Sequence, residues 1–268
     1  MFFFADLHIH SRYSRGSSSN MEPRVLCSFA RVKGLNLLGT GDFSHPKWLA
    51  ELREKLEEVG GTGFYTLREG KGDVFFVLTN EVSTNFEFEG EAKNVHHLIM
   101  VENFDIAEQV NEVLAKYGNL EADGRPMLEC TPEELVESLF QVDQNILVAP
   151  AHLWTSWFGA LGERGFDSLE ECYGDMLNYI YAVETGLSSD PPMNWRLSSL
   201  DKYVLMSNSD SHSPWPWRLG REANVFNLNE PSFRELIDAV KRKDKRRIVM
   251  TIEVAPEYGI PLRTGGWT

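Results

Sequence analysis

The sequence predicts a single α/β domain over residues 1–268, built as a barrel. Short apolar runs alternate with amphipathic stretches along the whole chain, and no linker, internal repeat or low-complexity tract divides it. Such regular alternation of strands and helices implies parallel βαβ units. Seven or eight units in 268 residues fit a closed α/β barrel better than two domains.

Eight short apolar runs have the length and composition of buried strands. In chain order they are residues 2–7, 35–39, 74–79, 95–101, 146–149, 179–183, 203–207 and 248–252. Polar or glycine-containing segments bound them, as expected of strands that end in loops.

Five amphipathic stretches between these strands predict helices over residues 23–32, 46–59, 106–117, 131–142 and 231–243. In the first, apolar residues recur at helical spacing. The second begins with a proline and ends at Gly60 and Gly61, and the third ends at Gly118. The fourth begins with Thr131-Pro132-Glu133-Glu134, which has the pattern of a capping box.

The composition excludes several classes of protein. No apolar run reaches the ~20 residues of a membrane-spanning helix, so we expect no membrane partner. No basic segment precedes the apolar first residues, which argues against a signal peptide. The three cysteines are widely separated and form no CxxC pair; this excludes a disulfide scaffold or zinc ribbon and suits a reducing, cytoplasmic location.

The chain is acidic, with 26 Lys and Arg against 40 Asp and Glu and a formal net charge of −14. Non-specific nucleic-acid binding depends on basic residues that neutralise phosphates, so this charge disfavours a protein that coats nucleic acid. A local basic groove, or acidic residues that bind metal, remain compatible with it. The one basic run, residues 241–247, is interpreted as a solvated helix end, with a nucleic-acid contact as the alternative.

Histidine and carboxylate residues follow five of the predicted strands. They are His8 and His10, Asp42, Glu81, His152, and Asp210 with His212. In a parallel barrel the carboxyl ends of all strands meet on one face, so these side chains should converge there. Residues two apart on a strand point the same way, so His8 and His10 can grip one ion. The mixture of imidazoles and carboxylates predicts a site for Zn, Mn or Fe.

Six motifs, in order along residues 5–225, resemble those of the PHP (polymerase and histidinol phosphatase) family. They are Asp6-Leu7-His8-Ile9-His10-Ser11, Thr40-Gly41-Asp42, Asn80-Glu81-Val82-Ser83, His97-Leu98-Ile99, Pro150-Ala151-His152 and Asn208-Ser209-Asp210-Ser211-His212. The resemblance implies a distorted, TIM-like seven-stranded (β/α)7 barrel, a phosphoesterase activity, and two or three divalent ions (Zn, Mn, Mg or Fe).

The resemblance also implies a set of ligands. His8, His10, Glu81 and Asp210 would hold one ion, and Glu81 would bridge to a second, completed by His97 and His152. A third would lie between His212 and Asp42. His212, Asp210 and Glu81 are the expected catalytic residues, with His212 as one carrier of the proton.

Two positions depart from the family pattern. Thr40-Gly41-Asp42 has an aspartate where histidine is usual, and Tyr13-Ser14-Arg15-Gly16 has an arginine where aspartate is usual. Asp42 can still bind a metal, whereas Arg15 cannot and is expected to contact a substrate phosphate instead. His96 and His97 face opposite ways on a strand. His97 matches the family register, and His96 is expected to be a partly buried histidine hydrogen-bonded to its surroundings.

Within the family, the chain more closely resembles the barrel of the endonuclease Q nucleases. The resemblance rests on stretches such as LHIHSRYS, PAHLW and ETGLSSDPPMNWRL. It implies cleavage of DNA beside deaminated or missing bases, so damaged DNA is the expected partner. The tail, residues 254–268, departs from that group and is expected to be irregular. Either the chain is a shortened or truncated form of a longer protein, or its role differs.

Several residues near the same face are candidate substrate contacts. Trp154 can stack on an extruded base, although packing within a loop would also account for a tryptophan there. Arg196 and Arg221 can hold the DNA backbone. Glu184 is either a substrate contact or a partner of a metal ligand. The alternative functions are a small-molecule phosphatase resembling histidinol phosphatase, whose substrate is a small phosphate ester, and a barrel that binds DNA lesions without cutting.

Overall fold

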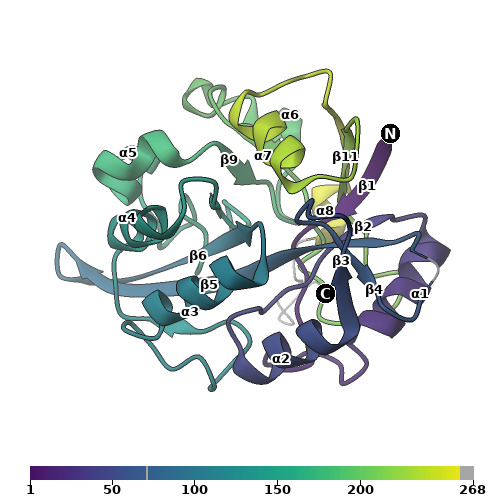
Figure 1. Ribbon diagram of the computed structural model, residues 1–268. Coiled ribbons are helices and arrows are strands. Elements are labelled where there is room, and N and C mark those ends of the chain that lie inside the picture. Colours follow the sequence, from purple (N-terminus) through teal and green to yellow (C-terminus); the bar gives the residue numbers. More distant parts are fainter. Residues whose placement is uncertain (71, 260–268) are drawn as a thin grey trace, which may run out of the picture.

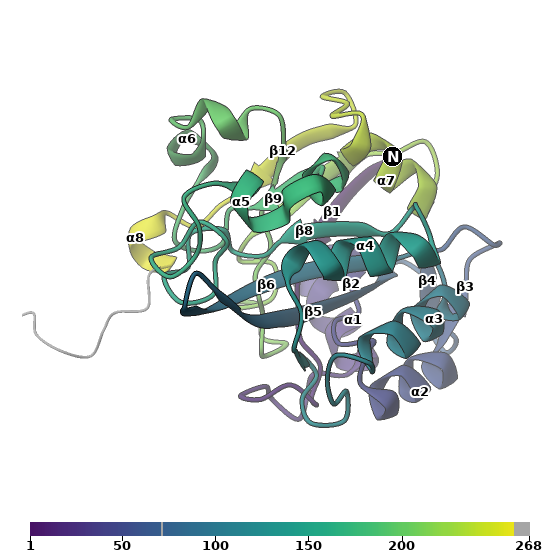
Figure 2. The same ribbon diagram turned by 90° about the vertical axis from the view of Figure 1, so that its left-hand side faces the viewer.

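The computed structural model describes residues 1–70 and 72–259, in which helices surround a mixed β-sheet (Figures 1 and 2). The strands are β1 (Phe2–Asp6), β2 (Leu37–Gly39), β3 (Leu56–Glu58), β4 (Tyr65–Leu67), β5 (Phe75–Phe88), β6 (Glu91–Val101), β7 (Met127–Leu128), β8 (Leu147–Pro150), β9 (Ala182–Glu184), β10 (Val204–Met206), β11 (Ala223–Asn227) and β12 (Ile248–Ile252). The α-helices are α1 (Pro23–Lys33), α2 (Pro46–Lys55), α3 (Phe104–Leu114), α4 (Pro132–Val142), α5 (Leu169–Tyr173), α6 (Pro191–Asn194), α7 (Phe233–Lys241) and α8 (Pro256–Gly259), with short 3₁₀ segments η1 (Gly174–Tyr179) and η2 (Ser198–Leu200).

The main sheet runs in the order β12-β11-β1-β2-β5-β6-β8, with β4 and then β3 added beside β5, and β7 pairing with β5. Strands β1, β2 and β5 are parallel, and β9 and β10 form a separate parallel pair. Among the described residues no strand pairing joins β9 or β10 to the main sheet, so the expected closed barrel is not formed by strand pairing. The fold is a mixed α/β fold.

The expectation of an all-parallel sheet is wrong at β6 and β11, which run antiparallel to β5 and β1. Strands β5 and β6 are joined directly by Glu89 and Gly90, both with positive φ, and a two-residue connection can only make an antiparallel hairpin. The hairpin extends both strands beyond the predicted ranges, to 14 and 11 residues.

Other elements agree with the sequence patterns more closely. Helix α1 ends at Gly34, which has φ 88°, and α4 begins at Thr131 with both hydrogen bonds of the expected capping box. Helix α2 stops at Lys55, however, because the next three residues form β3, which pairs with β4 across the glycine-rich turn. The tail is helical at α8; residues 260–268 lie outside the described part of the chain.

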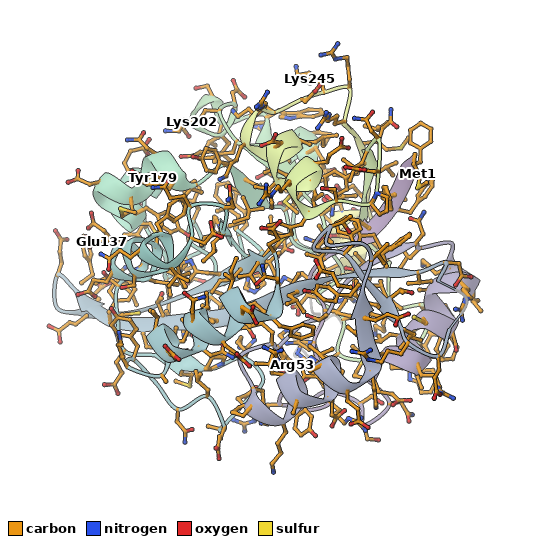
Figure 3. All side chains as sticks on the ribbon, in the orientation of Figure 1. Met1, Arg53, Glu137, Tyr179, Lys202 and Lys245 are labelled. Atoms are coloured by element: carbon orange, nitrogen blue, oxygen red, sulfur yellow. The ribbon has the colours of Figure 1, made fainter. Side chains whose placement is uncertain are left out.

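One buried hydrophobic cluster packs helix α7 against the strands. Its members come from α7, β1, β2, β5, β6 and β8–β11 and include Phe3, Val77, Leu98, Phe226 and Phe233. A second, larger cluster packs helices α1–α5 against other strand residues. Charged side chains such as Arg53, Glu137 and Lys245 lie at the periphery (Figure 3). Within residues 1–70 and 72–259, no helix has the length and apolar character needed to cross a membrane.

Candidate metal centre

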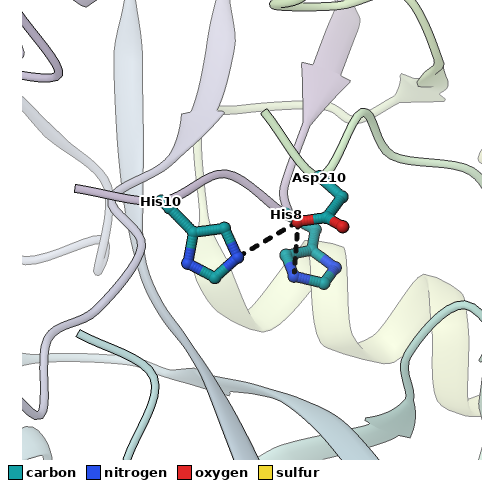
Figure 4. A group of neighbouring side chains, drawn as sticks. All are labelled: His8, His10 and Asp210. Atoms are coloured by element: carbon teal, nitrogen blue, oxygen red, sulfur yellow. Dashed lines mark hydrogen bonds and ion pairs between the residues drawn. The ribbon is translucent and has the colours of Figure 1, made fainter. Parts of the chain in front are cut away.

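Two histidines and an aspartate converge just beyond the end of β1 (Figure 4). His8 and His10 lie on an extended segment that continues β1 and is bridged to Ser211, next to Asp210. The Nε2 atom of His10 is 3.1 Å from Oδ1 of Asp210, and that of His8 is 3.8 Å from the same oxygen. Both rings are fully buried, whereas the Asp210 side chain is 32% exposed, so the group opens to solvent on the aspartate side.

A second group consists of Glu81 on β5, His96 on β6 and His152 just after β8. Oε1 of Glu81 lies 2.9 Å from Nδ1 of His96 and 2.9 Å from Nε2 of His152, and the two ring nitrogens are 3.2 Å apart. Three ligand atoms so close together are arranged as they would be around one ion.

Glu81 joins the two groups. Its second oxygen, Oε2, is 3.3 Å from Nε2 of His10, and Oε1 is 3.6 Å from Nε2 of His8. One fully buried carboxylate therefore faces histidines from both groups. A carboxylate in this position is able to contact ligands of both groups at once.

Of the two adjacent histidines, the structure brings His96 into the second group and not His97, the one expected there. His97 points away from the centre. Its Nδ1 lies 2.9 Å from the Tyr173 hydroxyl, and its Nε2 lies 3.0 Å from the Thr84 hydroxyl. The register of the hairpin explains this placement. Glu81 pairs with Leu98, so the residue two positions away, His96, shares its face, whereas His97 pairs with Val82 on the other.

Carboxylates behind His8 and His10 fix which ring nitrogen faces the centre. Nδ1 of His8 is 3.0 Å from Glu184, and Nδ1 of His10 is 3.0 Å from Asp42. Because a carboxylate only accepts hydrogen bonds at neutral pH, both Nδ1 atoms carry a hydrogen and both Nε2 atoms turn toward Glu81 and Asp210. Nε2 of His8 is buried without a hydrogen-bond partner. A cation between these rings and carboxylates would satisfy all of them, so the residues fit a divalent metal.

Glu184 thus lies behind a candidate ligand rather than at the opening. It also accepts hydrogen bonds from the backbone N–H of His152 and the side chain of Asn208, both at 2.8 Å. The hypothesis that Glu184 partners a metal ligand agrees with this geometry, and the substrate-contact alternative does not, because the side chain is 1% exposed.

Asp42 is placed in the same way, which changes the expected third site. It is fully buried and accepts hydrogen bonds from Nδ1 of His10 at 3.0 Å and from the backbone N–H of Ser11 at 2.5 Å. His212 also lies beside His10, with ring centroids 4.3 Å apart, and its Nδ1 donates to the Asp210 carbonyl at 3.0 Å. Asp42 and His212 are in neither of the two groups of potential ligands found in the described part of the chain.

The electrostatics of the centre favour a cation. Burial disfavours the charged form of His8 and His10, yet the facing carboxylates, Glu184 and Glu81 for the first and Asp42 for the second, raise the pKa of each ring well above 6.5. Burial also works against ionised Glu81, but the surrounding histidines hold its pKa well below 4.5. The centre therefore attracts positive charge in the form of protons or metal ions.

Unusual backbone conformations occur at the same place. Three of the five non-glycine residues with positive φ in the described chain are Asp42, His152 and Asp210. Such conformations cost free energy and persist where surrounding contacts hold them, as is common at functional sites.

The loop that carries Asp210 is held by hydrogen bonds with Asp6, Arg221 and Leu7. Asp6 accepts hydrogen bonds from the backbone N–H of Ser209 and of Gly220, and Arg221 donates two hydrogen bonds to the Ser209 carbonyl. From the other side, the Asn208 amide oxygen accepts the backbone N–H of Leu7 at 2.8 Å. Arg221, expected to contact DNA, is therefore engaged in holding this loop.

The other residues expected to contact the substrate differ in their exposure. Trp154 is partly buried against the core, and its indole N–H donates to Asn194 on α6 at 2.8 Å, which agrees with the packing interpretation. Arg15 and Arg196 are exposed. Arg15 follows Ser14, whose hydroxyl is 3.0 Å from Nδ1 of His10, so it lies one residue from the centre.

Sequence reasoning missed Arg125. Its Nη1 donates to Oε2 of Glu81 at 3.2 Å. The residue lies in a long connection between α3 and α4, where neither a strand end nor a motif signalled a functional side chain. The one available signal was local: Asp123-Gly124-Arg125-Pro126 has the composition of an ordered turn.

Comparison with solved structures places the fold and the centre in context. The chain superposes on endonuclease Q from Pyrococcus furiosus, described as a lesion-specific endonuclease, with a TM-score of 0.84 and 35% identity over 96% of this chain. The same values relate it to an endonuclease Q complex with a 27-mer duplex that has an abasic lesion at the active site. The chain spans 60% of each of those chains.

Two curated relatives carry no assigned function. The chain is 28% identical to protein YqxK of Bacillus subtilis over 96% of its own length, and it spans 66% of that relative. It is 36% identical over 149 residues to a protein of Methanocaldococcus jannaschii, of which it spans 16%. No family model matches the chain.

Proposed function

We propose that this chain is a metal-dependent phosphodiesterase of the PHP type that cleaves the DNA backbone beside abasic or deaminated nucleotides. One observation supports it most: two groups of side chains able to hold a metal ion both contact the carboxylate of Glu81. They do so in a chain 35% identical over 96% of its length to a lesion-specific endonuclease.

In this proposal, His8, His10, Asp210 and Glu81 hold one divalent ion, and Glu81, His96 and His152 hold a second. Ions at such positions supply Lewis-acid activation of water and neutralise charge that develops on the phosphate. The imidazole-rich donor set suits Zn, Mn or Fe better than Mg. His97 is not part of the set, and a third ion is not proposed.

The remaining residues of the centre orient the candidate ligands and accept a proton. Glu184 and Asp42 keep Nε2 of His8 and His10 free to bind an ion by holding the hydrogen on Nδ1. His212 is 35% exposed and donates from Nδ1 to a carbonyl, which leaves Nε2 as an acceptor. Burial and the neighbouring His10 lower the pKa of His212, so the ring is neutral at pH 7 and can take up a proton at Nε2.

The direct test is a nicking assay with labelled duplexes that contain one uracil, one hypoxanthine or one abasic site, alongside the undamaged duplex. With Mn²⁺ or Zn²⁺ we expect cleavage of the damaged strand only, abolished by EDTA. Glu81→Gln should lose activity, whereas Arg24→Gln, a change on the exposed face of α1, should keep it.

The assay also separates the alternatives. Intact damaged DNA together with hydrolysis of p-nitrophenyl phosphate would favour a small-molecule phosphatase. Tight binding of damaged DNA without cleavage, by a chain that holds its metals, would favour a lesion-binding protein.

A further inference from the structure

Arg125 is a basic side chain built into the candidate metal centre. Its Nη1 lies 3.2 Å from Oε2 of Glu81, the carboxylate that joins the two groups. Among residues 1–70 and 72–259, no other lysine or arginine pairs with a carboxylate of either group.

The backbone holds Arg125 in place from both sides. On one side, Gly124 donates its N–H to the Tyr13 carbonyl at 3.1 Å and packs so closely that an added Cβ would overlap Asp42 and Ser14. On the other side, the Pro126 carbonyl accepts the backbone N–H of Ser83 at 3.0 Å, two residues beyond Glu81 on β5.

These contacts connect the arginine to the metal ligands themselves. Asp42 holds His10, and the strand that carries Ser83 also carries Glu81. Strand β7, which follows Pro126 directly, pairs with β5 at Ser83 and Thr84. Arg125 thus lies two residues before β7, in a segment whose two neighbouring residues are held by backbone hydrogen bonds.

The guanidinium has more hydrogen-bond donors than its contact with Glu81 uses. It carries five N–H groups in a planar fork, and Glu81 accepts a hydrogen bond from one nitrogen, Nη1. The Arg125 side chain is 31% exposed, whereas Glu81 is fully buried, so part of this side chain reaches solvent beside a buried carboxylate. None of its nitrogens is among the buried side-chain atoms that lack a hydrogen-bond partner in the described part of the chain, so its remaining donors are accessible to a ligand.

We propose that Arg125 binds a phosphate of the substrate at the metal centre, using its solvent-facing donors while Nη1 remains near Glu81. The planar fork matches two oxygens of one phosphate group. Arg125 thus takes the role that the sequence suggested for Arg15. This inference rests on the proposed phosphodiesterase function and identifies one residue that contacts its substrate.

The test measures binding rather than turnover. In EDTA, where DNA stays uncut, fluorescence anisotropy gives the affinity of Arg125→Gln, Arg125→Lys, Arg24→Gln and the wild type for a duplex with one abasic site. Loss of a charge-assisted phosphate contact should weaken Arg125→Gln about tenfold. Its log–log salt slope should be smaller than that of the wild type by about 0.9. Arg125→Lys should recover part of the affinity, and Arg24→Gln should match the wild type.

A second arm does not depend on DNA. Millimolar inorganic phosphate should raise the melting temperature of the Mn²⁺-loaded wild type but not that of Arg125→Gln. Metal content, measured by plasma mass spectrometry, should be unchanged by the substitution. If the wild type binds no DNA but this difference in phosphate stabilisation persists, the proposed DNA substrate is wrong and the role of Arg125 stands.

Three results would overturn the inference. One is equal DNA affinity, salt slope and phosphate stabilisation in Arg125→Gln and Arg24→Gln. Another is loss of bound metal in Arg125→Gln with phosphate and DNA binding preserved, because Arg125 would then only position Glu81. The third is a wild type that binds neither phosphate nor DNA, which would remove the proposed function as well.

Discussion

At the scale of single residues, one carboxylate behind each of His8 and His10 determines which ring nitrogen carries the hydrogen. His8 and His10 would be ordinary buried rings without Glu184 and Asp42, which fix the hydrogen on Nδ1 and leave Nε2 for an ion. Partners of this kind tune metal ligands without touching the metal.

Asp42→Asn tests this role against that of a metal ligand. The amide is a weaker acceptor and can present its NH₂ group to His10, so the affinity for the ion at His10 should fall roughly 10–100-fold. Competitive titration with a metal-binding dye measures this affinity. At saturating metal the number of bound ions should equal that of the wild type; a number lower by one would make Asp42 a ligand itself.

His96→Gln and His97→Gln form a matched pair of variants. His96→Gln should lose one bound ion, because its Nδ1 faces Glu81 and His152. His97→Gln should keep the metal content but melt at a lower temperature, because its ring contacts Thr84 and Tyr173 in the core. Mass spectrometry of bound metal and thermal denaturation measure the two effects. Loss of metal from the His97 variant alone would restore the sequence-based assignment.

At this scale the sequence identified most of the side chains that converge. His8, His10, Glu81, His152 and Asp210 were all expected and all meet. The position of His96 in the group was not expected, because it depends on the register of an antiparallel hairpin, which adjacency in the sequence does not reveal.

Among the elements, the long β5–β6 hairpin and the connection from α3 to α4 do most to build the centre. The hairpin carries Glu81 and His96 on one face, and the connection contains Arg125, which contacts Glu81. The five expected helices are present, and local caps such as Thr131 and Gly34 mark their ends, whereas the short helices α5, α6 and α8 were not expected. Strand β11 and the direction of β6 were missed because strand pairing depends on contacts far apart in the sequence.

Gly124→Ala tests whether the connection supports the centre. A Cβ at this position would overlap the side chains of Asp42 and Ser14, both of which contact His10. We expect a loss of about 1–3 kcal/mol in the free energy of unfolding and weaker metal binding. Gly90→Ala is a useful comparison, since its turn has open space, and it should destabilise through its positive φ while leaving metal affinity unchanged. Wild-type metal affinity in Gly124→Ala would contradict the role given to the connection.

For the molecule as a whole, the buried acids set a dependence of stability on pH. Burial, together with Glu253 nearby, raises the pKa of Glu222 to about 8 from an ordinary 4.5. Between these two values the folded state keeps a proton that the unfolded state releases. The contribution of Glu222 to stability is therefore complete below pH 4.5 and is lost as the pH rises to 8.

Denaturant unfolding at pH 5 and pH 8 measures this effect. The wild type should lose stability over that interval, and Glu222→Gln should lose less, by an amount on the order of a few kcal/mol. Asp6, whose pKa burial raises to about 6, acts in the same direction, so the variant should not be fully independent of pH. Identical pH dependence in both proteins would show that Glu222 titrates normally.

The acidic surface also bears on the proposed substrate. A net charge of −14 offers no general attraction for DNA, so binding must depend on local cations such as Arg125 and on the metal centre. Composition was compatible with a metal site among the acids, but it could not locate Arg125, the arginine that pairs with Glu81.

Anomalous diffraction from a Mn²⁺-loaded crystal tests whether Glu81 joins two metal ions. If it does, two peaks roughly 3.5–4 Å apart should appear. One should lie among His8, His10 and Asp210 and the other between His96 and His152, with one oxygen of Glu81 directed at each. A single peak that Glu81 does not contact, or a peak ligated by His97, would contradict this role of Glu81.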